Sequence, residues 1–119
     1  TEIGRKAQIP YGLYLGKGFF SPMLAKDTGV STDDLSLFWR AVDGMFEIDR
    51  SASRGHMELR QVYIFRHENP LGNAHAGSLF ARLQVRRKDP SKPPRRFDDY
   101  EVRLSEDGLP EGITVYSLL

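Results

Sequence analysis

The stretch from Ser31 to Arg66 reads STDDLSLFWRAVDGMFEIDRSASRGHMELRQVYIFR and carries the strongest structural signals in the chain. Large apolar residues recur every three or four positions in its first half, which predicts a helix over residues 32–48 with one apolar face. Ser31 and Asp34 have the spacing of a capping box at the start of that helix. The apolar face consists of Leu35, Phe38, Trp39, Val42 and Phe46.

A polar loop joins this helix to a predicted strand. Residues 59–65 are rich in β-branched and aromatic side chains, which predicts the strand. The loop between them, residues 49–56, holds arginines, serines and a glycine, a combination that can follow a phosphate backbone closely. An equally good interpretation is that Arg50 pairs with Asp49 or Glu47 and only shapes the loop. The candidate binding residues in this loop are Arg50, Ser51, Ser53, Arg54 and His56.

The composition indicates one globular domain over residues 1–119. A chain of this length supports a single modest core, and 39% hydrophobic with 28% charged residues is ordinary for such a protein. No cysteine is present, so disulfides and thiolate metal sites are excluded. No apolar run reaches the ~20 residues of a membrane span, and the N-terminus lacks a signal-peptide pattern. We therefore expect no membrane partner.

A basic segment lies within a chain of formal net charge +1. Residues 82–96 contain seven basic residues and one acidic residue, a local charge of +6 that leaves −5 for the rest. Such a segment predicts contact with nucleic acid or with another subunit, and a merely solvated surface loop is the alternative. The candidate contact residues are Arg86, Arg87 and Lys88.

The other elements complete an α+β pattern of helices against a mostly antiparallel sheet. We expect strands at residues 8–20, 83–85, 100–104 and 113–118, and short helices from Pro22, closed by Gly29, and over residues 74–81. Tyr11 and Tyr14, on opposite faces of the first strand, are candidates for base stacking, with simple core packing as the alternative. An edge strand at each end would need covering by another segment, so the chain resembles half of a larger unit.

Several motifs in this chain are similar to one known family. They are Pro10 to Tyr14 (PYGLY), Met45 to Gly55 (MFEIDRSASRG), Phe97 to Val102 (FDDYEV) and Gly108 to Gly112 (GLPEG). In this order they resemble the C-terminal portion of the CRISPR-associated backbone protein of type I-C Cascade, the Cas-seven/Csd-two family. Members of that family are much longer, and their N-terminal motifs have no counterpart here.

The resemblance implies an RRM-like (ferredoxin-like) partial domain with one main helix and one or two short ones, the C-terminal half of a longer protein. It implies a non-catalytic, cytoplasmic prokaryotic subunit without cofactor or metal. The expected partners are guide RNA, target DNA through the guide, further copies of the subunit and other Cascade subunits. With the resemblance, RNA contact or subunit contact becomes the preferred interpretation of the polar loop.

Two other functions stay open. The first is a scaffold fragment that contacts only protein subunits, for instance by offering the extended segment near Gly12 to a partner's sheet. The second and weaker one is a metal-dependent nuclease, for which Asp98, Asp99 and Glu101 form the available carboxylate cluster. The spacing of His56, His67 and His75 matches no standard metal-ligand pattern.

Overall fold

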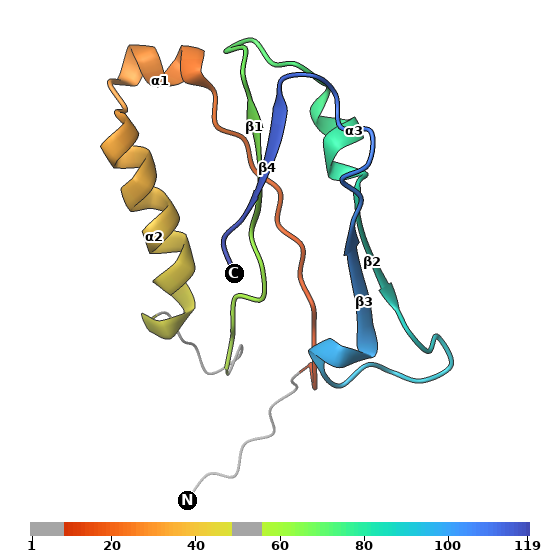
Figure 1. Ribbon diagram of the computed structural model, residues 1–119. Helices are drawn as coiled ribbons and strands as arrows, with labels where there is room; N and C mark the ends of the chain where they lie inside the picture. Colours follow the sequence, from red (N-terminus) through yellow and green to blue (C-terminus); the bar gives the residue numbers. More distant parts are fainter. Residues whose placement is uncertain (1–8, 49–55) are drawn as a thin grey trace, which may run out of the picture.

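The computed structural model describes residues 9–48 and 56–119 (Figure 1). These residues form an α+β structure in which two helices precede a set of antiparallel strands. In chain order the elements are α1 (Pro22–Thr28), α2 (Thr32–Ile48), β1 (Tyr63–His67), α3 (Ala76–Phe80), β2 (Leu83–Arg87), the 3-10 helix η1 (Phe97–Asp99), β3 (Tyr100–Leu104) and β4 (Ile113–Ser117).

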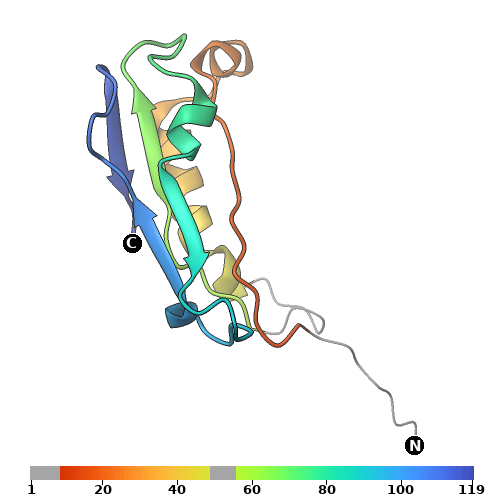
Figure 2. The same cartoon turned by 90° about the vertical axis from the view of Figure 1, so that its right-hand side faces the viewer.

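The four strands form two nested antiparallel pairs. β2 and β3 form the inner pair, with Val85 opposite Val102, and β1 and β4 form the outer pair, with Phe65 opposite Val115. The two pairs follow one another along a twisted ribbon, with α1 and α2 to one side (Figures 1 and 2). The strands are antiparallel as predicted. They form two small sheets because α3 and the turns at residues 105–112 interrupt the ladder between them.

Arg82 connects the two strand pairs where they meet. Its guanidinium donates to the carbonyl oxygens of Ser105 (3.2 Å), Asp107 (2.8 Å) and Gly108 (2.9 Å), on the connection between β3 and β4. Its own carbonyl oxygen accepts the Ser105 amide at 2.9 Å. Because turn carbonyls have no ladder partner, a charged donor that reaches several of them holds the turn against the start of β2.

The segment before α1 is extended but joins no sheet. The strand predicted over residues 8–20 is therefore wrong for residues 9–20. Pro10 has no amide hydrogen to donate and the three glycines offer no side chains to pack, so strand pairing is weak here. Aromatic contacts hold the two ends of the segment instead: Tyr11 lies 6.2 Å from Tyr100, and Phe19 lies edge-on 5.4 Å from Phe80, between ring centroids.

The strand predicted over residues 59–65 begins later than expected. β1 starts at Tyr63, opposite Ser117. Just before it, the side chain of Gln61 takes over the pairing, because its carbonyl oxygen accepts the Leu119 amide at 3.0 Å and its amide donates to the Leu119 carbonyl. Residues 59–62 of the predicted strand are not part of β1, because the ladder with β4 begins at the Tyr63–Ser117 pair.

The two N-terminal helices begin and end as the sequence predicts. At α1, the Ser21 hydroxyl accepts the Leu24 amide at 3.4 Å, and Gly29 ends the helix with a φ of 79°. At α2, Ser31 and Asp34 form the reciprocal capping box, with bonds of 2.9 and 3.1 Å. These caps satisfy amides that the first helical turn leaves free. None of the helices in the described part of the chain is long and apolar enough to cross a bilayer.

The later elements agree with the sequence predictions except at their ends. The helix predicted over residues 74–81 is α3, whose Leu79 is buried and whose Phe80 is half-buried. The strands predicted at residues 83–85, 100–104 and 113–118 are β2, β3 and β4. Residues 89–94 form no helix, as their prolines indicate.

Few apolar side chains are buried among the described residues. Ala25, Leu79 and Ile113 are the buried ones. Large apolar residues stay exposed on the segment before α1 and on α2, among them Phe19 at 79% and Leu37 at 57%. Even a small folded domain buries about 60% of the surface of its unfolded chain. The structure thus leaves apolar surface available for contacts with other polypeptide segments.

Gly112 is a position where the fold requires glycine. Its φ is 83°, and a Cβ atom there would collide with the side-chain amide of Asn73. We expect Gly112→Ala to lower the free energy of unfolding by about 1–3 kcal/mol, because both backbone strain and the collision act at the start of β4. Urea unfolding followed by circular dichroism measures this.

Gly18→Ala is the matched control, because a Cβ atom at Gly18 meets nothing within 4 Å. Equal unfolding midpoints for the two variants would contradict the role given to Gly112.

Candidate nucleic-acid interface

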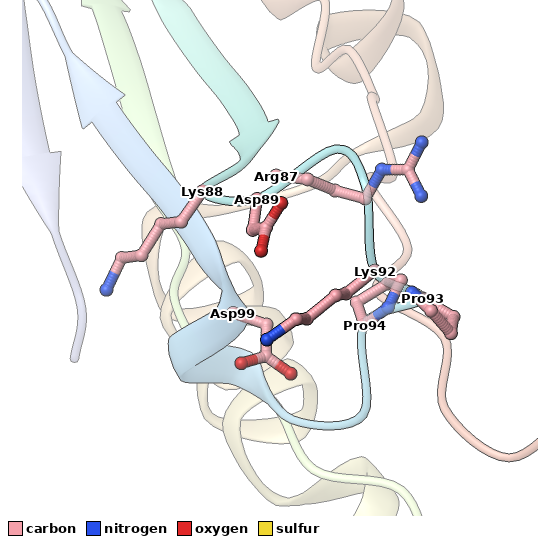
Figure 3. Close-up of a pocket in the computed structure, with 7 residues that line it drawn as sticks. All are labelled: Arg87, Lys88, Asp89, Lys92, Pro93, Pro94 and Asp99. Carbon is pink, nitrogen blue, oxygen red and sulfur yellow. The ribbon is translucent and has the colours of Figure 1, made fainter.

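The connection from β2 to β3 forms a basic tip at one end of the ribbon (Figure 1). We call residues 87–99 the hairpin tip. It contains three prolines, which restrict its backbone, and it borders a hollow of about 270 Å³ (Figure 3). The hollow is lined by Arg87, Lys88, Asp89, Lys92, Pro93, Pro94 and Asp99.

Two aspartates hold the hairpin tip by accepting hydrogen bonds from it. Asp89 Oδ1 accepts the amide of Ser91 at 3.0 Å and its hydroxyl at 2.6 Å. Asp99 Oδ2 accepts the amide of Arg95 at 2.8 Å and that of Arg96 at 3.2 Å. Each carboxylate thus replaces water around amides that the loop cannot pair with a strand, which gives the tip a defined shape.

These hydrogen bonds favour the ionised carboxylates. The Ser91 hydroxyl, followed by the Ser91 amide, holds the pKa of Asp89 below its usual 3.8. The pKa of Asp99 is also lowered, first by the Arg95 amide and, against an opposing effect of burial, by the amide and charge of Arg96 and the charge of Lys88. Both groups are therefore charged at neutral pH while their accepting oxygens serve the tip's own backbone.

The cationic side chains of the hairpin tip are exposed. They are Arg87, Lys88, Lys92, Arg95 and Arg96. Arg87 and Lys88 point to opposite sides of the loop (Figure 3). Because Asp98 and Asp99 belong to the same tip, residues 87–99 carry five basic and three acidic residues, a net +2. The net charge of the hairpin tip is therefore smaller than the +6 of residues 82–96, but a loop of defined shape carries it.

Two arginines of the basic segment serve the fold. Arg82 binds the turn carbonyls at the hairpin junction. Arg86, a predicted nucleic-acid contact, donates from Nε to Glu101 at 3.1 Å, and Arg103 lies 3.4 Å from the other oxygen of that carboxylate. Exposed ion pairs of this kind contribute about 0–1 kcal/mol to stability, so the pair with Glu101 holds the Arg86 side chain only weakly.

An aromatic cluster lies next to the hairpin tip. Tyr11 packs at a tilt against Tyr100, and the Arg60 guanidinium lies over the Phe97 ring at 4.9 Å from its centroid. Burial raises the pKa of Tyr11 and the charge of Arg60 partly opposes it, while Tyr100, Asp99 and Asp98 raise it further. The pairs Tyr11–Tyr100 and Arg60–Phe97 therefore belong to one neighbourhood, the aromatic cluster.

The structure brings together only some of the predicted site residues. Tyr11 lies in the aromatic cluster, whereas Tyr14 is 70% exposed. His56 is exposed, with Nε2 4.0 Å from Glu58. Four predicted binding residues, Arg50, Ser51, Ser53 and Arg54, lie outside the described residues.

Three residues of the cluster, Arg60, Phe97 and Tyr100, were not predicted as site residues. Arg60 lies within the predicted strand and Phe97 and Tyr100 within a family motif, so each had another interpretation. No local sequence signal indicates that Arg60 and Phe97 stack, because 37 positions separate them.

Two of the three carboxylates of the nuclease alternative are already engaged. Asp99 bonds to the tip backbone, and Glu101 pairs with Arg86 and Arg103. His67 Nδ1 accepts the amide of Asn73 at 2.9 Å in the turn after β1. Within residues 9–48 and 56–119, no group of three His, Asp or Glu side chains lies close enough to share a metal ion.

The described residues form an α+β structure that presents exposed cationic side chains on a hairpin tip of defined shape. A family model described as CRISPR-associated protein Cas7 matches residues 1–105, most of the sequence. The chain therefore belongs to the Cas7 family of CRISPR-associated proteins. The resemblance found in the sequence motifs is confirmed at the level of the family. A comparison with curated proteins gave no match.

The lowered pKa of Asp99 predicts an acid-sensitive hairpin tip. A carboxyl with a lowered pKa stabilises the folded state above its unfolded value of 3.8, and this contribution is lost as the pH falls through the folded-state pKa. NMR titration should therefore show the Asp99 carboxyl and the Arg95 and Arg96 amides shifting together below pH 3.8.

Asp99→Asn should abolish that shared titration, while Asp98→Asn should leave it unchanged, since Asp99 is the carboxylate that bonds to both amides. An Asp99 carboxyl that titrates at or above 3.8 would contradict the assignment.

Proposed function

We propose that this chain is part of a guide-RNA-binding backbone subunit of a CRISPR type I-C interference complex. Membership of the Cas7 family supports the assignment to a CRISPR effector complex. The motifs at residues 45–55 and 97–112, which resemble the type I-C protein, support the subtype. The subunit acts by holding RNA, without catalysis and without a cofactor, in the cytoplasm of a prokaryote.

The exposed cations of the hairpin tip are the observation on which the RNA-binding role rests. RNA presents a regular series of phosphates, and Arg and Lys on a preformed loop bind them without sequence preference. The tip's own carboxylates accept backbone amides, so its shape is set before RNA arrives. The polar loop at residues 49–56 supplies the second phosphate contact in this proposal, through Arg50 and Arg54.

The chain is proposed to be the C-terminal half of an RRM-like domain. The antiparallel strand pairs with a helix to one side are compatible with such a half. The exposed apolar residues on α2 and on the segment before it support a further polypeptide layer against them. The other partners in this proposal are target DNA, paired to the guide, further copies of the subunit and other Cascade subunits.

A second candidate function is a scaffold that contacts other subunits without binding RNA itself. The same exposed apolar surface favours it, because subunit interfaces bury such side chains. The two functions differ in one property, which is whether the chain binds nucleic acid at all.

Arg87→Ala combined with Lys88→Ala should weaken binding of single-stranded RNA. If each side chain neutralises one phosphate, the slope of log affinity against log salt should become less steep by roughly 1.4, since each contact contributes about 0.7. Fluorescence anisotropy of a labelled RNA at several salt concentrations measures the slope. Duplex DNA of equal length tests the preference for RNA.

Arg66→Ala combined with Lys26→Ala is the matched control, because both residues are exposed cations outside the hairpin tip. An equal loss of slope in the two double variants would show that only total charge matters. Absence of RNA binding by the unaltered chain would favour the scaffold function.

Arg50→Ala combined with Arg54→Ala tests the polar loop. We expect weaker RNA binding with a nearly unchanged thermal midpoint, because these arginines are proposed to contact phosphates and not the core. Anisotropy and thermal unfolding of the same preparation measure both effects. A large fall in the midpoint with intact RNA binding would instead assign the loop a structural role.

A further inference from the structure

We infer that Arg60 and Phe97, with Tyr11 and Tyr100 beside them, form a base-stacking site that gives the hairpin tip a preference for single-stranded nucleic acid. This inference rests on the proposed nucleic-acid binding. It adds that the site recognises unpaired bases as well as phosphates. Phosphate contacts alone accept single strands and duplexes alike, whereas stacking requires an unpaired base.

The stacked pair is the centre of the argument. The Arg60 guanidinium lies over the Phe97 ring, with Cζ 4.9 Å from the ring centroid. The Arg60 side chain is nevertheless 43% exposed, and its ion-pair partner Glu58 is 3.5 Å away from one of its nitrogens. A guanidinium held between an aromatic ring and a carboxylate, and still accessible, offers a surface on which a nucleobase can stack, as bases do on arginine and aromatic side chains in RNA-binding proteins.

The neighbouring tyrosines enlarge the surface. The rings of Tyr11 and Tyr100 are both half-buried, with centroids 6.2 Å apart at 37°. They come from different parts of the chain, the segment before α1 and the start of β3, and Tyr100 is held by the pairing of β3 with β2. Rigid aromatic residues lose little conformational entropy on binding, which suits them to stacking.

The aromatic cluster is continuous with the cationic hairpin tip. Phe97 and Tyr100 flank Asp99, whose carboxylate accepts the Arg95 and Arg96 amides and whose carbonyl oxygen accepts the Lys88 amide at 2.9 Å. Phosphate-binding side chains and the stacking surface therefore share one framework. This is the combination of a positive surface with aromatic platforms that single-strand binding proteins use.

The test compares strands that differ only in their bases. A labelled DNA single strand is measured by anisotropy against the same strand with abasic spacers, which keeps the phosphates and removes stacking. One stacked base contributes roughly 5- to 150-fold in affinity, so the unaltered chain should prefer the base-carrying strand at least ~5-fold. A single-stranded RNA of the same sequence shows whether the site distinguishes RNA from DNA.

Arg60→Lys should lower this preference toward 1 while leaving the salt slope unchanged, because it keeps the charge and removes the plane. Phe97→Leu should have the same effect through loss of the supporting ring. Arg66→Lys, the same exchange at an exposed position of β1, should retain the preference.

Equal binding of abasic and base-carrying strands, or an unchanged preference in Arg60→Lys, would overturn the stacking site while the proposed RNA binding stands. Absence of binding to every strand would overturn both.

Discussion

The nesting of one short antiparallel strand pair, β2 with β3, inside another, β1 with β4, is the constraint on which the rest of the structure depends. Neither pair is longer than five residues per strand, and an isolated two-stranded hairpin is marginal in water. Arg82 connects them, because its guanidinium binds three carbonyl oxygens of the turns between β3 and β4. This contact sets the position of the β2–β3 hairpin relative to the β1–β4 pair, and therefore the direction in which the hairpin tip projects.

Acidic and basic residues have different roles in the hairpin tip. Asp89 and Asp99 accept amides of the tip backbone, so their charges contribute to its shape. The arginines and lysines of the tip remain exposed, although Arg95 also donates to the Pro94 carbonyl oxygen at 3.1 Å. In the proposed function, RNA therefore meets a loop that is already ordered, which reduces the conformational entropy lost on binding.

The aromatic contacts show how a segment without strand pairing is still positioned. Tyr11 and Phe19 anchor the extended segment before α1 at its two ends, against Tyr100 and Phe80. Between these anchors Tyr14 and Leu15 remain exposed, as several large apolar side chains do on α2. In the proposed assembly these surfaces are covered by further polypeptide, and the described fold is a framework completed by that contact.

The sequence by itself determined the local features: the caps of α1 and α2, the strands β2 to β4, and the family membership carried by its motifs. These follow from periodicity, capping and residue type, which act over a few positions. Only the tertiary structure decided that residues 9–20 form no strand, that β1 starts at Tyr63, and that Arg86 pairs with Glu101. It also decided that Arg60 lies on Phe97. Each of these depends on which distant residue lies opposite, and a strand forms or a cation is engaged only when that partner is in place.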